Sequence, residues 1–302
     1  AAAARLIPEI AARMRGARDR RPRPFVDETV YADSTAMVAA GHLAAARYLG
    51  DTDAADAAFR ALERVWAEGF RPDAGLLHRP GDPSAGEYLS DQACVLGAIL
   101  DAFELAQRTV WLERARSLAD LLIARFTDDG NGGFLDRPHD AHGPGALELP
   151  HRPIADAPEP SGNGAAALAL LRLAGLSGVT RYGDVARRTL AAFAGTARAI
   201  ATAAATYLRA VDWATAPTTS VVIVGSGEPA RDLLLATALR TYRPRTVVRR
   251  FVAGDVDEAA LPEAVRAMLG VDAPRAYVCV GAVCEAPVAS PDELDAILRR
   301  RP

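Results

Sequence analysis

The chain contains no lysine, and all 35 of its basic residues are arginines. Schiff-base chemistry needs a lysine amine, and so does the phosphate-binding lysine of a P-loop. Both mechanisms are therefore excluded within this sequence.

Charge of one sign and long apolar runs are scarce as well. The formal net charge is -3 over 302 residues, so no basic surface favours nucleic acid as a partner. No apolar run reaches the roughly 20 residues that a membrane helix needs, and the first residues do not form a signal peptide. We therefore expect a cytoplasmic protein that binds neither nucleic acid nor membranes.

Cysteine is rare, with three residues in the whole chain: Cys94, Cys279 and Cys284. Cys94 falls in a predicted helix rich in small residues, where a small core side chain is the simplest interpretation. The spacing of Cys279 and Cys284 offers too few partners for zinc and is not a Cys-x-x-Cys motif. Since disulfides are uncommon in cytosolic proteins, we predict reduced thiols.

A short motif occurs twice, as Ala-Gly-Leu-Leu-His-Arg-Pro at 74–80 and as Gly-Gly-Phe-Leu-Asp-Arg-Pro at 132–138. Each copy follows an arginine-containing amphipathic segment and leads into a helix rich in alanine and glycine. Repeats of this length indicate helical hairpins, each of which buries its apolar face against its neighbours.

The hairpins pair two kinds of helix. Small residues suit the crowded inner ring of a toroid, and mixed charges suit its outer ring. The predicted inner helices are 34–48, 91–107 and 161–176, and the predicted outer helices are 53–66, 110–126 and 182–193. The return connections, about 67–89 and 127–160, are long, and long loops in compact domains are usually functional. We expect them to gather on one face, beside the N-termini of the inner helices, and to carry any site.

The texture changes after Pro217, where strand and helix patterns alternate. Three strands are predicted at 221–224, 246–252 and 276–280, with helices at 229–242, 261–269 and 291–300. The predicted domains are therefore 1–216, half of an α/α toroid, and 217–302, a small three-stranded α/β segment.

Several segments together resemble the C-terminal half of the YyaL and spermatogenesis-associated thioredoxin-domain protein family. Among them are Asp128-Asp-Gly-Asn-Gly-Gly-Phe134 and Pro160-Ser-Gly-Asn-Gly-Ala-Ala166, and the others are 20–33, 111–115, 170–174, 277–279 and 284–287. The resemblance implies a mainly α fold, a partial (α/α)6 toroid similar to that of N-acylglucosamine 2-epimerases, with a small C-terminal α/β layer. Ser34-Thr35 stands where the family has a Trp-Asn pair, which puts an inherited sugar contact there in doubt.

The resemblance also implies an upstream thioredoxin-like domain whose Cys-x-x-Cys this chain lacks, so redox catalysis is not expected in it. Three hairpins make only half of a six-hairpin ring and leave apolar helix edges uncovered. We expect another protein chain to complete the ring, either a copy of this chain or a polypeptide that carries the missing N-terminal half.

Acidic residues concentrate around the long loops, and paired carboxylates across a cleft can transfer protons or hydrolyse glycosides. The candidate catalytic residues are Asp27, Glu87, Asp91 and Asp156, and the candidate contacts for a sugar are Tyr88, His78, Arg152, Glu159, Ser161 and Asn163. The competing interpretation is that Asp33, Asp91 and Ser161 cap the inner helices. For Arg152 it is that the side chain ties a loop to a helix.

Two cofactor motifs are weaker. Residues 225–230 read Gly-x-Gly-x-x-Ala between a strand and a helix, the context of a dinucleotide fingerprint. However, Arg249 and Arg250 replace the expected acidic residue, so a tight structural turn is favoured. His139, His142 and His151 share a loop, but their spacing fits no standard zinc site.

We predict neither a metal nor a cofactor. The predicted function is a toroid with a carbohydrate-binding or epimerase/glycosidase-like site, and the alternatives are a non-catalytic assembly module for a thioredoxin-like partner or nucleotide binding at 225–230.

Overall fold

The computed structural model describes residues 2–141, 149, 151–252, 263–269 and 273–300, in two units, residues 1–30 and residues 31–302. The first unit contains helix α1 (Ala2–Arg18), followed by an extended segment. The apolar stripe of α1, formed by Leu6, Ile10 and Met14, is exposed within this unit.

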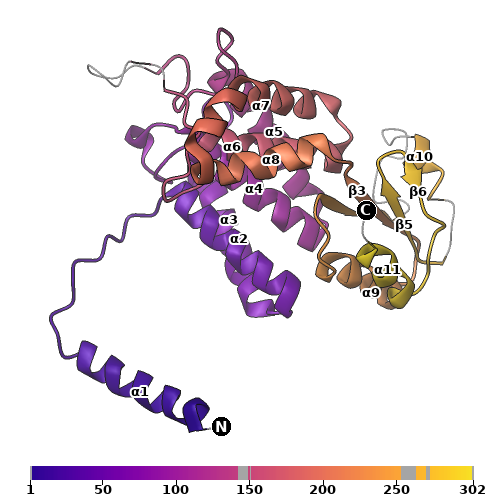
Figure 1. Cartoon of the computed structure of the whole chain (residues 1–302), viewed down its shortest axis with the longest axis horizontal. Helices are drawn as coiled ribbons and strands as arrows, with labels where there is room; N and C mark the ends of the chain where they lie inside the picture. The colour runs from indigo at the N-terminus through magenta and orange to yellow at the C-terminus, as the bar shows by residue number, and fades with distance from the viewer. Residues whose placement is uncertain (1, 142–148, 150, 253–262, 270–272, 301–302) are drawn as a thin grey trace. The chain divides into compact units, whose positions relative to one another are not determined.

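The second unit is built on helices that follow one another in two layers (Figure 1). Inner helices α2 (Ala32–Leu49), α4 (Leu89–Ala106), α6 (Gly162–Ser177) and α8 (Ala205–Thr215) each pack against the next inner helix. Outer helices α3 (Thr52–Gly69), α5 (Thr109–Phe126) and α7 (Thr180–Ile200) each pack against the inner helix that precedes them in the chain. The predicted hairpins are confirmed, and their arrangement is that of a partial (α/α) toroid.

The inner helices can lie close together because their contact faces are made of small residues. Ala36, Ala93, Ala166 and Ala167 are fully buried between helices, and short side chains let helix axes approach. Larger side chains such as Trp111 on α5 fill the space between the two layers. Each fully buried large apolar side chain contributes about 1.5–3 kcal/mol.

Residues 197–213 are divided between two helices and a short turn. Helix α7 continues to Ile200, a 3-10 turn η3 (Ala201–Ala204) follows, and α8 then begins at Ala205. Ala201 has a φ of 50°, which α-helical backbone cannot accommodate. The chain therefore turns there, and α8 becomes the fourth inner helix.

The C-terminal part forms a sheet with strand order β4-β3-β5-β6. Its elements are β3 (Thr219–Val224), α9 (Glu228–Arg240), β4 (Thr246–Arg250), α10 (Glu263–Arg266), β5 (Arg275–Val280), β6 (Val283–Cys284) and α11 (Pro291–Arg299). Strands β3 and β4 are parallel and joined through α9, whereas β5 runs antiparallel to β3. The predicted three strands are present, but the prediction missed β6, which is too short to give a sequence pattern.

The prediction of reduced thiols at Cys279 and Cys284 is wrong, because the two residues form a disulfide. Strands β5 and β6 form a hairpin whose register places Cys279 directly opposite Cys284, with the Cα atoms 3.9 Å apart. Gly281, with a φ of 58°, makes the turn between the strands. Spacing alone does not reveal such a register.

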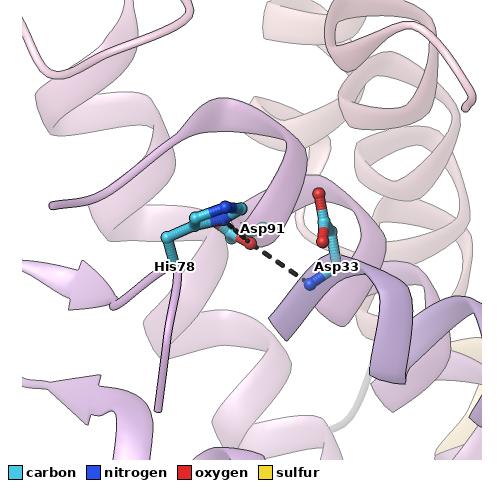
Figure 2. Close-up of side chains that lie close together, drawn as sticks. All are labelled: Asp33, His78 and Asp91. Carbon is cyan, nitrogen blue, oxygen red and sulfur yellow. Dashed lines mark hydrogen bonds and ion pairs between the residues drawn. The ribbon is translucent and has the colours of Figure 1, made fainter. Parts of the chain in front are cut away.

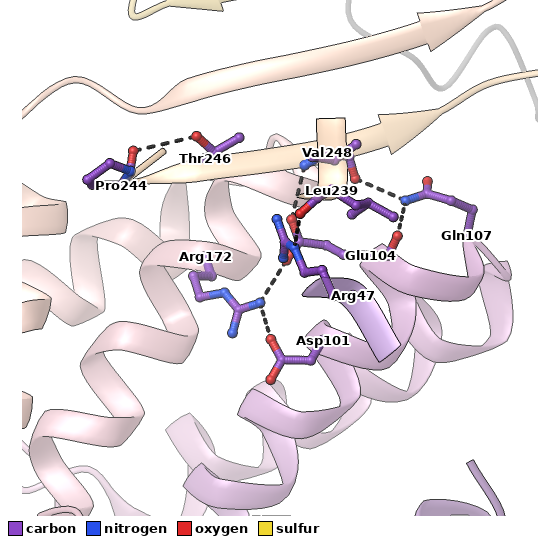
Figure 3. Close-up of polar contacts among 9 residues, drawn as sticks. All are labelled: Arg47, Asp101, Glu104, Gln107, Arg172, Leu239, Pro244, Thr246 and Val248. Atoms are coloured by element: carbon purple, nitrogen blue, oxygen red, sulfur yellow. Dashed lines mark hydrogen bonds and ion pairs between the residues drawn. The ribbon is translucent and has the colours of Figure 1, made fainter. Parts of the chain in front are cut away.

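Side chains at the C-terminal end of α4 attach the sheet to the helices of the partial toroid, which we call the helical arc (Figure 3). Glu104 accepts a hydrogen bond from the Val248 amide at 3.0 Å, and the Gln107 side chain donates to the Val248 carbonyl at 3.2 Å. The Gln107 side-chain oxygen accepts from the Arg250 amide at 2.7 Å. The open edge of β4 is therefore hydrogen-bonded by side chains, which blocks pairing with a further strand there.

Glu104 also lies at the centre of a charged cluster (Figure 3). Its side chain is 1% exposed and accepts a hydrogen bond from Arg172 at 2.8 Å, while Arg172 donates to Asp101 at 2.6 Å. Arg47 lies 3.8 Å from Glu104 and donates to the Leu239 carbonyl on α9. The cluster joins α2, α4, α6 and the α/β layer through one buried carboxylate.

The described helices include none that is both long and apolar enough to cross a membrane.

Candidate functional site

The two copies of the repeated motif are held by inner-helix amides in the same way. The first long loop carries the two-residue strands β1 (Phe70–Arg71) and β2 (Gly75–Leu76) and the 3-10 turn η1 (Pro83–Ala85). There, the Gln92 side chain accepts from the Leu76 amide and donates to the Leu76 carbonyl, both at 2.8 Å. In the second copy, Asn163 accepts from the Phe134 amide at 2.7 Å and donates to the Phe134 carbonyl at 2.9 Å.

The same loops cap the inner helices. The His78 carbonyl accepts from Ala32 at the start of α2, and the Asp136 carbonyl accepts from Leu89 at the start of α4. His78 and Asp136 occupy equivalent positions of the repeat. The repeat therefore places the long loops against the N-termini of α2 and α4, on the face where the sequence predicted a site.

Three chemically active side chains converge on this face: Asp33, His78 and Asp91 (Figure 2). Nδ1 of His78 lies 3.1 Å from each carboxylate oxygen of Asp91, and Asp91 accepts a hydrogen bond from the Asp33 amide at 3.1 Å. One nitrogen or oxygen atom from each of the three lies within 4.8 Å of the others. One imidazole and two carboxylates form a donor set that zinc and related cations accept.

The capping interpretation of Asp33 and Asp91 is wrong. The N-cap residues of α2 and α4 are Tyr31 and Tyr88, so both aspartates lie inside the first helical turn. Instead, the Asp91 carboxylate accepts a hydrogen bond from the Asp33 backbone amide on the neighbouring helix α2. No local sequence pattern would reveal this contact. Ser161 does hold the N-cap position of α6, but its side chain makes no capping hydrogen bond.

Burial and mutual contact perturb the His78–Asp91 pair. The Asp91 side chain is fully buried, and this burial raises the pKa of the carboxyl group. The hydrogen bond to Asp91 raises the pKa of His78 above its ordinary value. The His78 side chain is 29% exposed, so the pair can exchange a proton with a bound molecule.

Two tyrosines flank His78. The Tyr31 ring centroid lies 4.9 Å from that of His78, and the Tyr88 ring meets it edge-on at 5.0 Å. Tyr88 is partly exposed. Aromatic rings with a polar end offer both stacking surface and a hydrogen-bonding hydroxyl to a ligand.

Cys94 lies one turn beyond Asp91 on α4. Burial, together with the charges of Asp33, Asp91 and Glu159, raises the pKa of the Cys94 thiol to about 12. The thiol is therefore no nucleophile at neutral pH. Because Glu159 acts on this thiol, it belongs to the same negatively charged face as Asp33 and Asp91.

Two predicted site residues, Asp156 on the second loop and Asn163 at the start of α6, make backbone contacts. Asp156 accepts from the amides of Ser161 and Thr206, both at 2.8 Å, and so joins the N-termini of α6 and α8. Burial opposes ionisation of Asp156, but these hydrogen bonds outweigh it and lower its pKa. Asn163 uses both amide hydrogens, on the carbonyls of Phe134 and Pro153.

Arg152 donates to the carbonyls of Asn131 and Gly132, at 3.1 Å and 3.0 Å, and lies over the Phe193 ring. These contacts match the loop tie that the sequence offered as the competing interpretation. The Arg152 guanidinium also lies 3.5 Å from the Asp128 carboxylate, so Arg152 ties parts of the second loop together.

The remaining predicted residues are spread out. Glu87 is half-buried beside Tyr88, whereas Asp27 belongs to the unit of residues 1–30, where it accepts from the Thr29 amide. Of the loop histidines, His139 contacts the Arg125 carbonyl, His151 lies near Asp136, and His142 lies outside the described residues.

Sequence reasoning missed Tyr31 as a member of the site. A signal was available, since Tyr31-Ala-Asp33 before α2 parallels Tyr88-Leu-Ser-Asp91 before α4. In both places the tyrosine precedes the first helical residue and an aspartate follows in the first turn.

The glycine motif at 225–230 forms a closely packed turn. Gly225 has a φ of 105°, and a Cβ atom placed on it would lie 2.7 Å from the Ala273 carbonyl oxygen. Glycine is therefore the residue that this backbone position accommodates. This contact supports the interpretation of the motif as a tight structural turn.

Titration of His78 tests the geometry of the pair. Because the raised pKa arises first from the hydrogen bond to Asp91, an Asp91→Asn variant is expected to lower it, as NMR of the imidazole would show. A raised folded pKa contributes stability below about pH 6.5, the unfolded value, and that contribution is lost as the pH rises through the folded pKa. An unchanged His78 titration in the variant would contradict the pairing.

Comparisons with known proteins support the predicted resemblance. No protein-family profile matches the chain. It is similar to spermatogenesis-associated protein 20 of Homo sapiens, with 27% identity over 93% of this chain, and to that of Rattus norvegicus, with 26% identity over 94%. The chain spans only 37% and 38% of the length of these relatives.

Weak similarity to solved structures was also found. An inactive variant of an α-1,6-mannanase from Salegentibacter sp. in complex with α-1,6-mannotetrose matches with a TM-score of 0.47 and 14% identity, over 80% of this chain and 61% of that one. Cellobiose 2-epimerase from Bacillus thermoamylovorans matches with a TM-score of 0.45 and 14% identity, over 57% and 46% of the two chains.

Proposed function

We propose that the long-loop face of this protein binds a carbohydrate and that His78 exchanges a proton with it. The observation that carries the proposal is the accessible His78–Asp91 pair between the rings of Tyr31 and Tyr88. The pair supplies proton transfer, and the rings supply a surface for the apolar face of a sugar.

The orientation of His78 follows from its partner. Nδ1 is bound to Asp91, so Nε2 is the ring nitrogen left to give or take a proton. Asp91 is fully buried and acts as a positioning residue that holds the ring and favours its charged form. His78 is the residue that would touch the ligand.

The charge of the face selects the ligand class. Asp33, Asp91 and Glu159 contribute negative charge there, which disfavours phosphates and other anions. Carboxylates accept hydrogen bonds from hydroxyl groups. A neutral, polyhydroxylated molecule therefore fits better than a charged metabolite, and this favours sugars.

The test is a panel of neutral mono- and oligosaccharides, measured by thermal shift and calorimetry on the chain and three variants. At least one sugar is expected to raise the melting temperature, and His78→Gln and Asp91→Asn should each weaken its binding about tenfold or more, since each removes a charge-assisted contact. The matched control is Asp82→Asn, a partly exposed loop aspartate paired with Arg79, which should bind normally.

Absence of any shift across the panel would contradict the proposal, and so would equal losses in Asp82→Asn and Asp91→Asn. If a thioredoxin-like protein binds tightly while no sugar does, the assembly-module alternative is favoured instead.

We also propose that another chain covers the two ends of the helical arc. Val38 on α2 and Leu208 on α8 are 61% and 55% exposed, and each lies on an inner helix. The chain also spans well under half of the relatives that it matches. Either a second copy or a polypeptide with the missing half would bury these edges.

Light scattering tests this association. The chain alone is expected to show a mass above that of the monomer, and a Val38→Glu/Leu208→Glu double variant should shift it toward the monomer, because charges oppose burial of the edges. Val283→Glu is the control, since Val283 is exposed on β6 and away from the inner helices. A monodisperse monomer of the unaltered chain would contradict self-association.

A further inference from the structure

A cavity of about 400 Å³ lies where the end of α4, the start of α5 and the end of β4 meet. Arginines dominate its polar lining: Arg108 from the α4–α5 turn, and Arg249 and Arg250 from β4. None of the described residues that line it is acidic. Its size is that of a small-molecule site.

Arg249 is the unusual member. Its Nε atom is buried and has no hydrogen-bond partner in the described part of the chain. The guanidinium lies 4.3 Å from the centroid of the Phe251 ring. Burial, with a smaller effect of the Arg116 charge, lowers the pKa of Arg249 to about 10. A desolvated guanidinium without a counter-charge is costly for a protein to keep.

The other groups around the cavity do not neutralise the positive charge of Arg249. Arg250 forms an ion pair with Asp232 at 3.5 Å, and Arg108 is exposed at the N-cap of α5. Helix α5 begins at Thr109 and has no acidic residue in its first turn, so its positive dipole end adds to the field of the arginines.

A second arginine-rich cleft shows the contrast. It is lined by Arg47, Arg172 and Arg245, among others, but these arginines have acidic partners within the chain. Arg172 binds Asp101 and Glu104, and Arg245 binds Asp212 at 2.6 Å. These three arginines of that cleft are therefore neutralised within the chain, whereas Arg249 has no acidic partner among the described residues.

We infer that the cavity beside Arg249 is an anion-binding site that takes a phosphate-bearing small molecule. The planar guanidinium groups of Arg108 and Arg249 match the oxygens of a phosphate. Phe103, Phe251 and Leu112 supply an apolar wall, which favours a phosphate ester with an organic part over the free ion. This site is separate from the sugar face, whose charge has the opposite sign.

The test uses calorimetry and thermal shift at constant ionic strength, with inorganic phosphate, phenyl phosphate and chloride as probes. Both phosphates are expected to raise the melting temperature more than chloride, and phenyl phosphate is expected to bind more tightly than the free ion. Arg249→Gln and Arg108→Gln should each weaken phosphate binding about tenfold. Arg209→Gln, an exposed arginine of the second cleft, is the matched control and should bind normally.

Stability of the ligand-free variants separates binding from folding. Arg249→Gln removes a half-buried cation that has no acidic partner among the described residues, so its melting temperature should not fall below that of the unaltered chain. The inference is overturned if phosphate acts no better than chloride, or if Arg209→Gln loses as much affinity as Arg249→Gln.

The chain itself holds a competing source of negative charge. The sequence after Val252 includes Asp255, Asp257 and Glu258, which lie outside the described residues. A variant with Asp255→Asn, Asp257→Asn and Glu258→Gln is therefore measured in parallel. If phosphate binds this variant but not the unaltered chain, the counter-charge is internal and the inference is overturned.

Discussion

Replacing Glu104 with alanine is expected to lower the free energy of unfolding by about 3–5 kcal/mol, since it leaves Arg172 buried with a lost partner. The carboxylate accepts hydrogen bonds from Arg172 and from the Val248 amide, and it faces Arg47. Its removal therefore takes a partner away from three groups at once, one of which is the backbone amide of Val248 on β4. Urea unfolding followed by circular dichroism would measure the loss.

Glu113→Ala is the matched control for this prediction. Glu113 is an exposed glutamate on α5, and surface substitutions of this kind usually change stability by less than about 0.5 kcal/mol. If Glu104→Ala unfolds at the same urea concentration as Glu113→Ala, the buried cluster contributes nothing net. Removal of a single partner is the informative change, because replacement of a whole buried charged cluster by apolar residues often leaves stability unchanged.

Asn163→Ala is expected to cost about 2–3 kcal/mol, because it leaves the buried amide and carbonyl of Phe134 without their partners. Phe134 is fully buried, so water cannot replace the lost hydrogen bonds. The Pro153 carbonyl loses its donor as well. Thermal or urea unfolding of the variant gives the value directly.

Asn131→Ala provides the comparison, since Asn131 is exposed and its side chain donates a hydrogen bond to the Asp128 carboxylate. A loss well below that of Asn163→Ala is expected. Equal losses would mean that the inner-helix amide is not what holds the second loop. Gln92, which holds Leu76 in the first loop, should behave like Asn163.

The helical framework could be predicted because its cause is local. Runs of alanine and glycine marked α2, α4 and α6 as inner helices, and mixed charges marked α3, α5 and α7 as outer ones. The unequal loop lengths then placed the long connections on one face. Burial of small residues between neighbouring helices needs no knowledge of distant contacts.

The site could be predicted only in part, because its contacts are not local. His78 and Asp91 were both candidates, but their pairing depends on the loop folding back over the start of α4. The sequence offers Asp33 as a helix cap, whereas in the structure its backbone amide donates a hydrogen bond to Asp91. A capping pattern reports on one helix end and cannot indicate a carboxylate that serves the neighbouring helix.

Two further features required knowledge of strand register. Cys279 and Cys284 meet only because β6 pairs with β5, and two residues of strand are too few to give an alternating pattern. Glu104 is similar, since a glutamate near the end of an alanine-rich helix gives no sign that a strand will arrive beside it. In both cases the missing information was which segments become neighbours.

The hydrogen bonds from Glu104 and Gln107 to β4 have a consequence for how this chain can be divided. A cut after Ala216 would leave the Glu104 carboxylate and the Gln107 side-chain amide without the β4 backbone groups that they bind. Water would have to replace the lost backbone partners, so we expect the helical part alone to be less stable than the same helices in the whole chain.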